Sequence, residues 1–407
     1  MTLAPSSPNI RFLSIALLGL ILATGAILRI WSLEKFQGIG FDEKLYVGYV
    51  EQITKLGVWN YPEIVENYIE RQTSEKHAFL PPTRVTFLLA ASAWQSVTGM
   101  PTLESVRAIS TLASLIMLGA GAALAWRVGG CRLALGLSAL VAFAPTQIYS
   151  AHRALIDGFF ATIAFFVFWS LWEILQNPKS RRWLVVYGMS LALMVLTKEN
   201  AAFVYLALLG ILAFTPWLKM GSISKPLIYV TLGGPAIGSG ILILLGGGFE
   251  NVFTAFLLNV RKSYDLPYAI YAGDGPWFRY VIDMISVAPA MTILAIGGFF
   301  RTHRNERFAL YCLIFVGISY LVMGNLRYGL NLRYSLIWDF PLRYFAMLPL
   351  IAISSWAKTP RTQALLLTLA VIAVALLDLL NYRDIFIEHA VYDPVPKTLM
   401  QALRMVK

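Results

Sequence analysis

The sequence is short of charged residues and of the residues that most often bind metals. Only 14% of its 407 residues are Asp, Glu, Lys or Arg, whereas a soluble domain carries about 25%. It has four histidines and two cysteines, Cys131 and Cys312, which lack CxxC spacing and lie in or beside apolar segments. These shortages argue against a soluble protein, a disulfide framework and a cysteine-ligated metal site.

Most of the sequence consists of long apolar runs. Hydrophobic residues make up 58% of the chain, which predicts an all-α integral membrane protein that crosses the bilayer many times. The formal charge is +11. Its basic residues fall in short loops between apolar runs, as the positive-inside rule expects, so we expect no nucleic-acid partner.

Apolar runs predict about 11 spans, each of which needs about 20 residues. They cover residues 11–31, 104–126, 133–150, 157–176, 183–196, 200–217, 225–245, 284–300, 308–323, 341–356 and 362–380. We expect the first run to be an uncleaved span, because no small-residue cleavage site closes it. The shorter segment 84–98 cannot cross if the other spans alternate in direction, so it is expected to lie at the outer interface or to dip in and return.

The loops predict the orientation of the spans. Short basic loops, such as the one with Arg127 and Arg132, alternate with the other connections and are expected on the cytoplasmic face. Three long connections, 32–103, 246–283 and 324–340, then share the outer side. The first is long enough to be functional and is expected to carry interfacial helices. We expect residues 1–407 to form one transmembrane domain in a bacterial cytoplasmic membrane, with no separate soluble C-terminal domain.

Charged and polar residues gather at the outer ends of the predicted spans. This topology brings to one face of the membrane Asp42, Glu43, His152, Arg153, Asp157, Lys198, Glu199, Arg261, Tyr264, Arg333 and Arg343. Adjacent carboxylates beside a span are costly to keep near lipid, so their presence indicates a function.

Simpler roles are open for several of these residues. Asp42 and Glu43 could cap the N-terminus of an interfacial helix, where acidic side chains are favourable. Arg153 and Asp157 are four residues apart and could form an ion pair along one helix face. The outer arginines could extend to lipid headgroups.

The chemistry of this set favours a donor linked to a lipid phosphate. Lys198 and Glu199 interrupt an apolar stretch with no loop to solvate them, and ionisable residues in such a place are functional by default. A carboxylate can take a proton from an acceptor hydroxyl or amine. Arg and Lys can hold a phosphate leaving group. No nucleotide-binding loop is apparent in the sequence, and the charged groups lie on the outer side.

The motifs over roughly residues 10–220 resemble those of the GT-C glycosyltransferases of family 39, which include protein O-mannosyltransferases and the aminoarabinose transferase of lipid A. The matching segments are Phe41-Asp42-Glu43 with Tyr46 (first-loop acidic motif), Leu80-Pro81-Pro82 (Lys/His-Pro-Pro-Leu), Val106 to Ser110 (Arg-Leu-Pro-Ser), Val128 to Arg132 (basic Gly-Gly turn), Arg153 to Asp157 (Arg-x-x-x-Asp) and Leu196 to Glu199 (Leu-Thr-Lys-Gly). Farther on, either Leu332-Arg333-Tyr334 or Leu342-Arg343-Tyr344 with Pro349 is similar to the late Arg-Tyr-Leu-x-Pro segment.

The resemblance implies a GT-C helical bundle and inverting transfer of a sugar from a polyprenyl phosphate to an extracytoplasmic lipid, glycan or protein. It implies Asp42 as the catalytic base, with Glu43 and Asp157 in support. Donor phosphate binding would fall to Arg153, Lys198, Arg261, Arg333 and Arg343, and acceptor or substrate binding to Tyr46, His77, His152, Glu199 and Tyr264. Some relatives use a divalent metal, which Asp42, Glu43 and Asp157 could reach.

Two departures from the family pattern bear on this interpretation. Leu80 replaces the basic residue that usually precedes the proline pair, and Glu199 stands where the family often has glycine. Two other functions remain open at this point: a transporter or flippase of a lipid-linked saccharide, and a non-catalytic subunit for envelope assembly. The transporter hypothesis predicts charged groups along the whole path through the membrane, including the inner half of the spans. The sequence has few charged residues there.

Overall fold

The computed structural model describes residues 8–32, 38–75, 79–265, 270, 273–327 and 329–390. Every regular element in that part of the chain is a helix, as the sequence predicts, and no β-strand occurs there. An all-helical fold suits long apolar runs, because a helix satisfies its backbone hydrogen bonds within one segment and needs no partner strand in lipid.

Sixteen described α-helices follow one another along the chain. They are α1 (Pro8–Ile30), α2 (Phe41–Leu56), α3 (Tyr61–Ser74), α4 (Val85–Thr98), α5 (Thr102–Ala142), α6 (Pro145–His152), α7 (Ile156–Gln176), α8 (Arg181–Thr197), α9 (Ala201–Leu218), α10 (Lys225–Leu245), α11 (Phe249–Asp265), α13 (Arg279–Val287), α14 (Pro289–Arg301), α15 (Arg307–Met323), α16 (Asp339–Ser354) and α17 (Pro360–Tyr382). Two short 3₁₀ helices, η1 (Val58–Asn60) and η2 (Leu332–Trp338), and one π-helix, η3 (Arg383–Glu388), complete the order.

The helix lengths make the chain a multi-pass membrane protein. Seven described segments are long and apolar enough to cross a bilayer: Phe12–Ile30, Thr102–Ala142, Ile156–Gln176, Ala201–Leu218, Lys225–Leu245, Leu332–Ser354 and Pro360–Glu388. Helices α4, α14 and α15 are apolar but shorter. The count of about 11 spans and the interfacial position of α4 therefore stay predictions.

Glycine and proline set helix boundaries that differ from the predicted ones. The predicted spans 104–126 and 133–150 begin in one helix, α5, which bends at Gly130 with φ of 67° and ψ of −164°. A residue with positive φ inside a helix favours glycine, which has no Cβ to clash. The second span is broken before Pro145, and the predicted span 284–300 is split before Pro289 into α13 and α14. Both prolines start a helix, where the missing N–H costs nothing.

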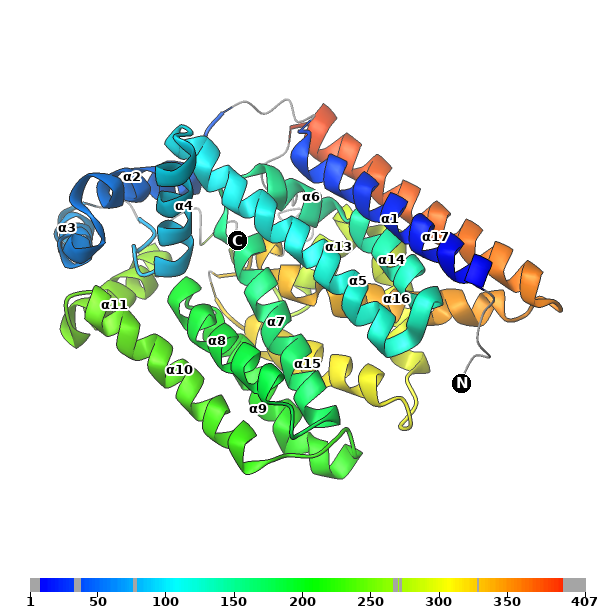
Figure 1. Cartoon of the computed structure of the whole chain (residues 1–407). Helices are drawn as coiled ribbons and strands as arrows, with labels where there is room; N and C mark the ends of the chain where they lie inside the picture. Colours follow the sequence, from blue (N-terminus) through cyan, green and yellow to red (C-terminus); the bar gives the residue numbers. More distant parts are fainter. Residues whose placement is uncertain are drawn as a thin grey trace.

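The helices differ greatly in how much of their surface the protein covers. In α7 83% of the spanning window is buried, whereas in α1 the share is 11% and in α17, within Pro360–Glu388, 28%. Figure 1 shows both α1 and α17 toward one edge of the molecule in this view, with α7 inside the bundle. The residues of α7 therefore face other helices, and charged groups at its N-terminal end must find partners within the protein.

The first long connection carries helices, as the sequence predicts. Helices α2, α3 and α4 gather at one end of the molecule, close to α11 from the second long connection (Figure 1). The α3 and α11 helices are tied together where Lys262 Nζ donates to the Glu75 carbonyl at 2.9 Å and Asn251 Nδ2 donates to Glu66 Oε1 at 3.2 Å. These four helices form the end of the fold where the candidate site lies.

Candidate active site

Glu43 fixes the start of α2 and thereby positions Asp42. Its buried carboxylate accepts hydrogen bonds from the backbone N–H of Gly40 at 2.7 Å and of Ala154 at 2.8 Å. Arg107 lies 3.4 Å and Arg153 3.9 Å from the same carboxylate. An acidic side chain in the first turn of a helix satisfies orphan N–H groups and is favourable to the helix dipole. Glu43 is thus the structural half of the acidic pair, and it binds α2 to the α6–α7 joint.

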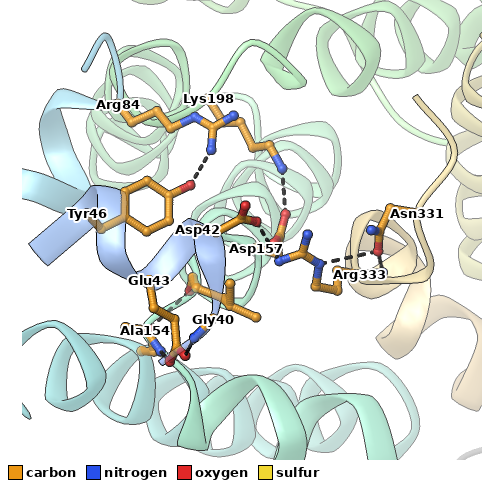
Figure 2. Close-up of polar contacts among 12 residues, drawn as sticks. Gly40, Asp42, Glu43, Tyr46, Arg84, Ala154, Asp157, Lys198, Asn331 and Arg333 are labelled. Carbon is orange, nitrogen blue, oxygen red and sulfur yellow. Dashed lines mark hydrogen bonds and ion pairs between the residues drawn. The ribbon is translucent and has the colours of Figure 1, made fainter. Parts of the chain in front are cut away.

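Asp42 points to the other side, toward a cluster of charged residues (Figure 2). Its Oδ2 accepts a hydrogen bond from Arg333 Nη1 at 3.0 Å, and its side chain remains 23% exposed. The same Arg333 nitrogen lies 3.7 Å from Asp157 Oδ2. Arg333 therefore bridges two carboxylates that come from α2 and α7.

Asp157 is the buried centre of the cluster. It lies in the first turn of α7 and forms an ion pair with Lys198, the residue that ends α8. The Lys198 ammonium also lies 3.8 Å from the centre of the Tyr334 ring, within range of a cation–π interaction. Lys198 has extended backbone angles, φ of −162° and ψ of 147°. The break between two apolar helices thus turns a lysine inward instead of toward a solvated loop.

Arg84 links the cluster to α2 and to Glu199. It donates to the Tyr46 hydroxyl and, at 2.9 Å, to Glu199 Oε1. Burial raises the pKa of the Tyr46 phenol, so Tyr46 stays neutral beside this guanidinium. The buried Arg84 Nε atom has no hydrogen-bond partner among the described residues. Glu199 therefore neutralises Arg84, while Lys198 pairs with Asp157.

Three tyrosines hold the segment that carries Arg84. Tyr49 donates to the Leu80 carbonyl at 2.7 Å, Tyr61 to the Pro82 carbonyl at 2.5 Å and Tyr68 to the Phe79 carbonyl at 3.4 Å. The proline pair has no N–H with which to join a helix or ladder. Side chains from α2 and α3 therefore supply the contacts that backbone pairing would supply elsewhere, and Arg84 lies two residues beyond Pro82.

An apolar groove opens beside the charged cluster. Its volume is about 500 Å³, and it runs between α8, α9, α10 and α11. Leu242, Phe253 and Phe256 are among the apolar side chains that line it, and Lys198 and Glu199 are its charged lining residues. A groove of this kind can take an apolar chain and place an attached polar group beside the cluster.

The structure brings together part of the predicted site. Asp42, Asp157, Lys198 and Arg333 are in direct contact, and Tyr46 and Glu199 join them through Arg84. Arg153 lies on the other side of α2, buried against Glu43 and 5.7 Å from the centre of the Tyr149 ring. The i,i+4 pair of Arg153 with Asp157 does not form, because the chain leaves α6 at His152 and enters α7 at Ile156.

Other predicted residues lie apart from the cluster. Arg343 is fully buried and pairs with Asp339 at 3.0 Å and with Asp378 at 2.8 Å, apart from the cluster that contains the other late pair, Arg333-Tyr334. His152 Nδ1 is 3.2 Å from the Tyr382 hydroxyl. Arg261 and Tyr264 are exposed on α11, and His77 lies outside the described residues.

The carboxylates do not form the proposed metal site. The carboxylate oxygens of Glu43 accept hydrogen bonds from two backbone N–H groups and from Arg107. Arg333 bridges Asp42 and Asp157. Within the described ranges no group of three His, Cys, Asp or Glu side chains is arranged to hold a metal ion. The three acids therefore do not fit a shared divalent cation in this arrangement.

Sequence reasoning missed two residues that shape the site, Arg84 and Asn331, and named Arg107 and Tyr334 only as members of motifs. Arg84 follows the proline pair by two residues and supplies a basic group close to the motif in which Leu80 lacks one. Asn331 accepts hydrogen bonds from the backbone N–H of Arg333 at 3.0 Å and from its Nε at 3.3 Å, which orients that side chain. A search for basic residues on both sides of the proline pair could have found Arg84.

Comparison with known proteins assigns the fold. Residues 82–237, about two fifths of the chain, match the model of the PMT_2 family, dolichyl-phosphate-mannose-protein mannosyltransferase. No curated protein matches the chain. The matching family segment includes Arg84, Arg153, Asp157, Lys198 and Glu199.

Solved structures of low sequence identity have a similar fold. ArnT from Cupriavidus metallidurans bound to undecaprenyl phosphate has a TM-score of 0.55 and 15% identity, with 98% of this chain and 76% of ArnT covered. The oligosaccharyltransferase of Archaeoglobus fulgidus in the apo form has a TM-score of 0.61 and 13% identity, with 98% of this chain and 58% of that protein covered. The same archaeal enzyme, AglB, in complex with an inhibitory peptide and a dolichol-phosphate has a TM-score of 0.53 and 14% identity, again with 98% and 58% covered.

These findings confirm the predicted resemblance and the predicted fold class. The chain is a membrane protein with the GT-C fold, and its residues 82–237 are similar to the PMT_2 family. It spans about three quarters of the length of ArnT and somewhat over half of the length of the archaeal enzyme.

Proposed function

We propose that this PMT_2-like protein transfers a sugar from a polyprenyl-phosphate donor to an acceptor on the extracytoplasmic side of a cytoplasmic membrane. The observation that carries the proposal is the contact of Asp42, Asp157, Lys198 and Arg333, of which Lys198 also lines an apolar groove. The printed ligands of the similar structures, undecaprenyl phosphate for ArnT and dolichol-phosphate for AglB, support a lipid-phosphate donor.

In this proposal the groove holds the polyprenyl chain. A prenyl tail is apolar and needs a path that shields it from the charged cluster, and the groove is lined chiefly by apolar side chains from helices α8 to α11. Lys198 would then meet the phosphate where the tail ends. Burying the tail supplies binding free energy in proportion to the apolar area removed from water, which can be used to hold the sugar in place.

Arg333 and Lys198 would form the phosphate clamp. Each donates to a carboxylate, yet a guanidinium has five N–H donors and an ammonium has three, so both can also bind phosphate oxygens. Charge-assisted hydrogen bonds to phosphate are among the stronger polar contacts in proteins. The clamp would stabilise the negative charge that builds up on the leaving phosphate.

Asp42 would act as the general base in an inverting displacement. The acceptor hydroxyl or amine gives its proton to Asp42, and its freed electron pair forms a bond to the anomeric carbon. The bond between that carbon and the phosphate oxygen breaks, and its electrons leave with the polyprenyl phosphate. Asp157 would hold Lys198 and Arg333 in position through this step. The partly exposed position of Asp42 suits contact with an incoming acceptor.

The test is sugar transfer by the protein in lipid nanodiscs. We expect Asp42→Asn to lower the transfer of radiolabelled sugar from polyprenyl phosphate to an envelope acceptor fraction by about 10²- to 10⁴-fold, because the amide cannot take the proton. Binding of undecaprenyl phosphate should be no weaker, since the variant removes a negative charge.

The matched control is Glu70→Gln, which changes an exposed carboxylate on α3 and should leave transfer unchanged. Undiminished transfer by Asp42→Asn would remove Asp42 as the base. If the wild-type protein moved a lipid-linked saccharide across vesicles without forming a new glycosidic bond, a transporter would replace the transferase.

A further inference from the structure

Glu199 places a negative charge where the proposed function binds a phosphate. It follows Lys198 directly, and both residues line the groove. The Glu199 side chain is 29% exposed, and its Oε1 accepts a hydrogen bond from Arg84 at 2.9 Å. Although burial opposes ionisation of this carboxyl, the Arg84 and Lys198 charges lower its pKa, so it is anionic at neutral pH.

Among the described residues around the proposed phosphate position, the charges balance because of Glu199. Three cations, Arg84, Lys198 and Arg333, are in contact with three carboxylates: Asp42, Asp157 and Glu199. The neighbouring Glu43 is engaged by Arg107 and Arg153 on the other side of α2. With glycine at position 199 the inner set would carry a net positive charge. With glutamate it is neutral.

The phosphate changes its charge during the proposed reaction. In the donor it is a diester with one negative charge. When the sugar has left, the product is a monoester with about −1.5 to −2 charge at pH 7. A nearby carboxylate therefore repels the product more strongly than it repels the donor, because the Coulomb energy scales with the product of the charges.

We infer that Glu199 is a specificity residue that weakens binding of the polyprenyl-phosphate product relative to the sugar-bearing donor and thereby promotes product release. The inference rests on the proposed function, since it concerns the two lipid phosphates of that reaction. Arg84 holds the Glu199 carboxylate beside Lys198, so Glu199 can repel the product phosphate while Lys198 and Arg333 still attract both lipids.

The experiment compares product inhibition with donor use. We expect Glu199→Gln to lower the inhibition constant of undecaprenyl phosphate by about tenfold, the order of magnitude for removing one charge about 5 Å away when screening is close to that of water, with a dielectric constant of about 80. The donor KM should fall by less, about threefold, because the donor has the smaller charge. Turnover should fall as release of the tightly held product becomes limiting.

The pH dependence identifies the charge of the product as the cause. Below about pH 6 the product takes up its second proton and has nearly the charge of the donor. The difference in product affinity between Glu199→Gln and the wild type should then shrink. A change in the pairing of Arg84 would not follow the ionisation of the phosphate.

The direction of the change in product affinity shows whether Glu199 repels the product or only positions Arg84. If Glu199 only held Arg84 in place, the glutamine variant would loosen Arg84 and weaken the binding of donor and product together. Glu199→Asp keeps the charge and should return the product affinity toward the wild-type value. Glu70→Gln again serves as the exposed control.

A higher or unchanged inhibition constant in Glu199→Gln would overturn the inference and leave the proposed function standing, provided that the wild type transfers sugar. Failure of undecaprenyl phosphate to bind the wild type at all would instead reject the proposed donor, and the inference with it.

Discussion

In the described part of the chain, the charged cluster and the interior network around Arg343 are both built from ion pairs, but the cluster lines the groove of about 500 Å³ and the network does not. Asp42, Arg333 and Glu199 keep 23%, 16% and 29% of their side-chain surface exposed. Arg343, Asp339 and Asp378 keep at most 6%. The space beside Asp339 and Arg343 is about 20 Å³, room for a single water.

In the interior network, the N–H donors of Arg343 bind acceptors within the protein. Arg343 binds Asp339, Asp378 and the Leu140 carbonyl, which joins α16, α17 and α5. Arg29 similarly donates to the carbonyls of Gly25, Val141 and Ala142 and to Ser114. The comparison teaches that a buried arginine near the end of a span indicates a binding site only where its donors also reach a cavity.

The largest effect is expected from replacing Arg343, and it is an effect on the stability of the protein. Replacement by methionine leaves Asp339 and Asp378 buried without their cation, which costs about 3–5 kcal/mol. We expect a large fall in the thermal unfolding temperature of the detergent-solubilised protein, while the donor KM of the fraction that stays folded is unchanged.

Arg361→Met changes an exposed arginine and is the control. Adding Asp339→Asn and Asp378→Asn to Arg343→Met should recover much of the stability, because no buried charge then lacks a partner. A normal unfolding temperature with a raised donor KM in Arg343→Met would return Arg343 to the phosphate clamp.

The opposite pattern is expected at Lys198. Lys198→Gln removes a charged donor from the proposed clamp, and such a hydrogen bond contributes about 1.5–3 kcal/mol. Undecaprenyl phosphate should therefore bind about 10- to 100-fold more weakly in a lipid-nanodisc binding assay. Stability should change less than in Arg343→Met, because Arg333 remains 3.7 Å from Asp157.

Lys358→Gln, in an exposed loop, should leave both properties unchanged. Unfolding of Lys198→Gln as severe as that of Arg343→Met, with normal phosphate affinity in the folded fraction, would make the two networks alike and contradict the distinction.

The smallest effect is expected at Tyr61, which supports the cluster from a distance. Tyr61→Phe leaves the Pro82 carbonyl without its donor and should cost about 1 kcal/mol of stability. Burial raises the pKa of the Tyr61 phenol, so the wild-type hydroxyl remains a donor across the usual pH range. Transfer activity should fall a few-fold as Arg84 loses its fixed support.

The exposed Tyr229 gives the matched control, Tyr229→Phe. Unchanged unfolding temperature and activity in Tyr61→Phe would show that the Phe79–Pro82 segment is held by packing alone.

The sequence predicted the helical fold well because apolar runs and basic loops report directly on membrane topology. It failed at boundaries such as Ala142–Pro145, where a single proline divides an apolar run that hydropathy treats as continuous. The predicted first outer loop has helices, since its alternating polar and apolar residues suit the edge of a membrane protein.

The sequence predicted several residues of the candidate site, but it predicted less well which of them contact one another. Topology placed Asp42, Asp157 and Lys198 on one face, and they do meet. It could not separate Arg333 from Arg343, since both precede a tyrosine near the same span and only packing shows that Arg343 is enclosed. Arg84 was missed because its position depends on three tyrosine contacts far from it in sequence.

The bond between Asp42 and Arg333 joins residues 291 positions apart. A chain made from its N-terminus exposes Asp42 early, but the partner arginine is synthesised only after α15. The proposed base and the proposed clamp therefore cannot meet in a nascent chain that has only its first spans in the membrane. The long separation delays assembly of the site until the bundle around it is nearly complete.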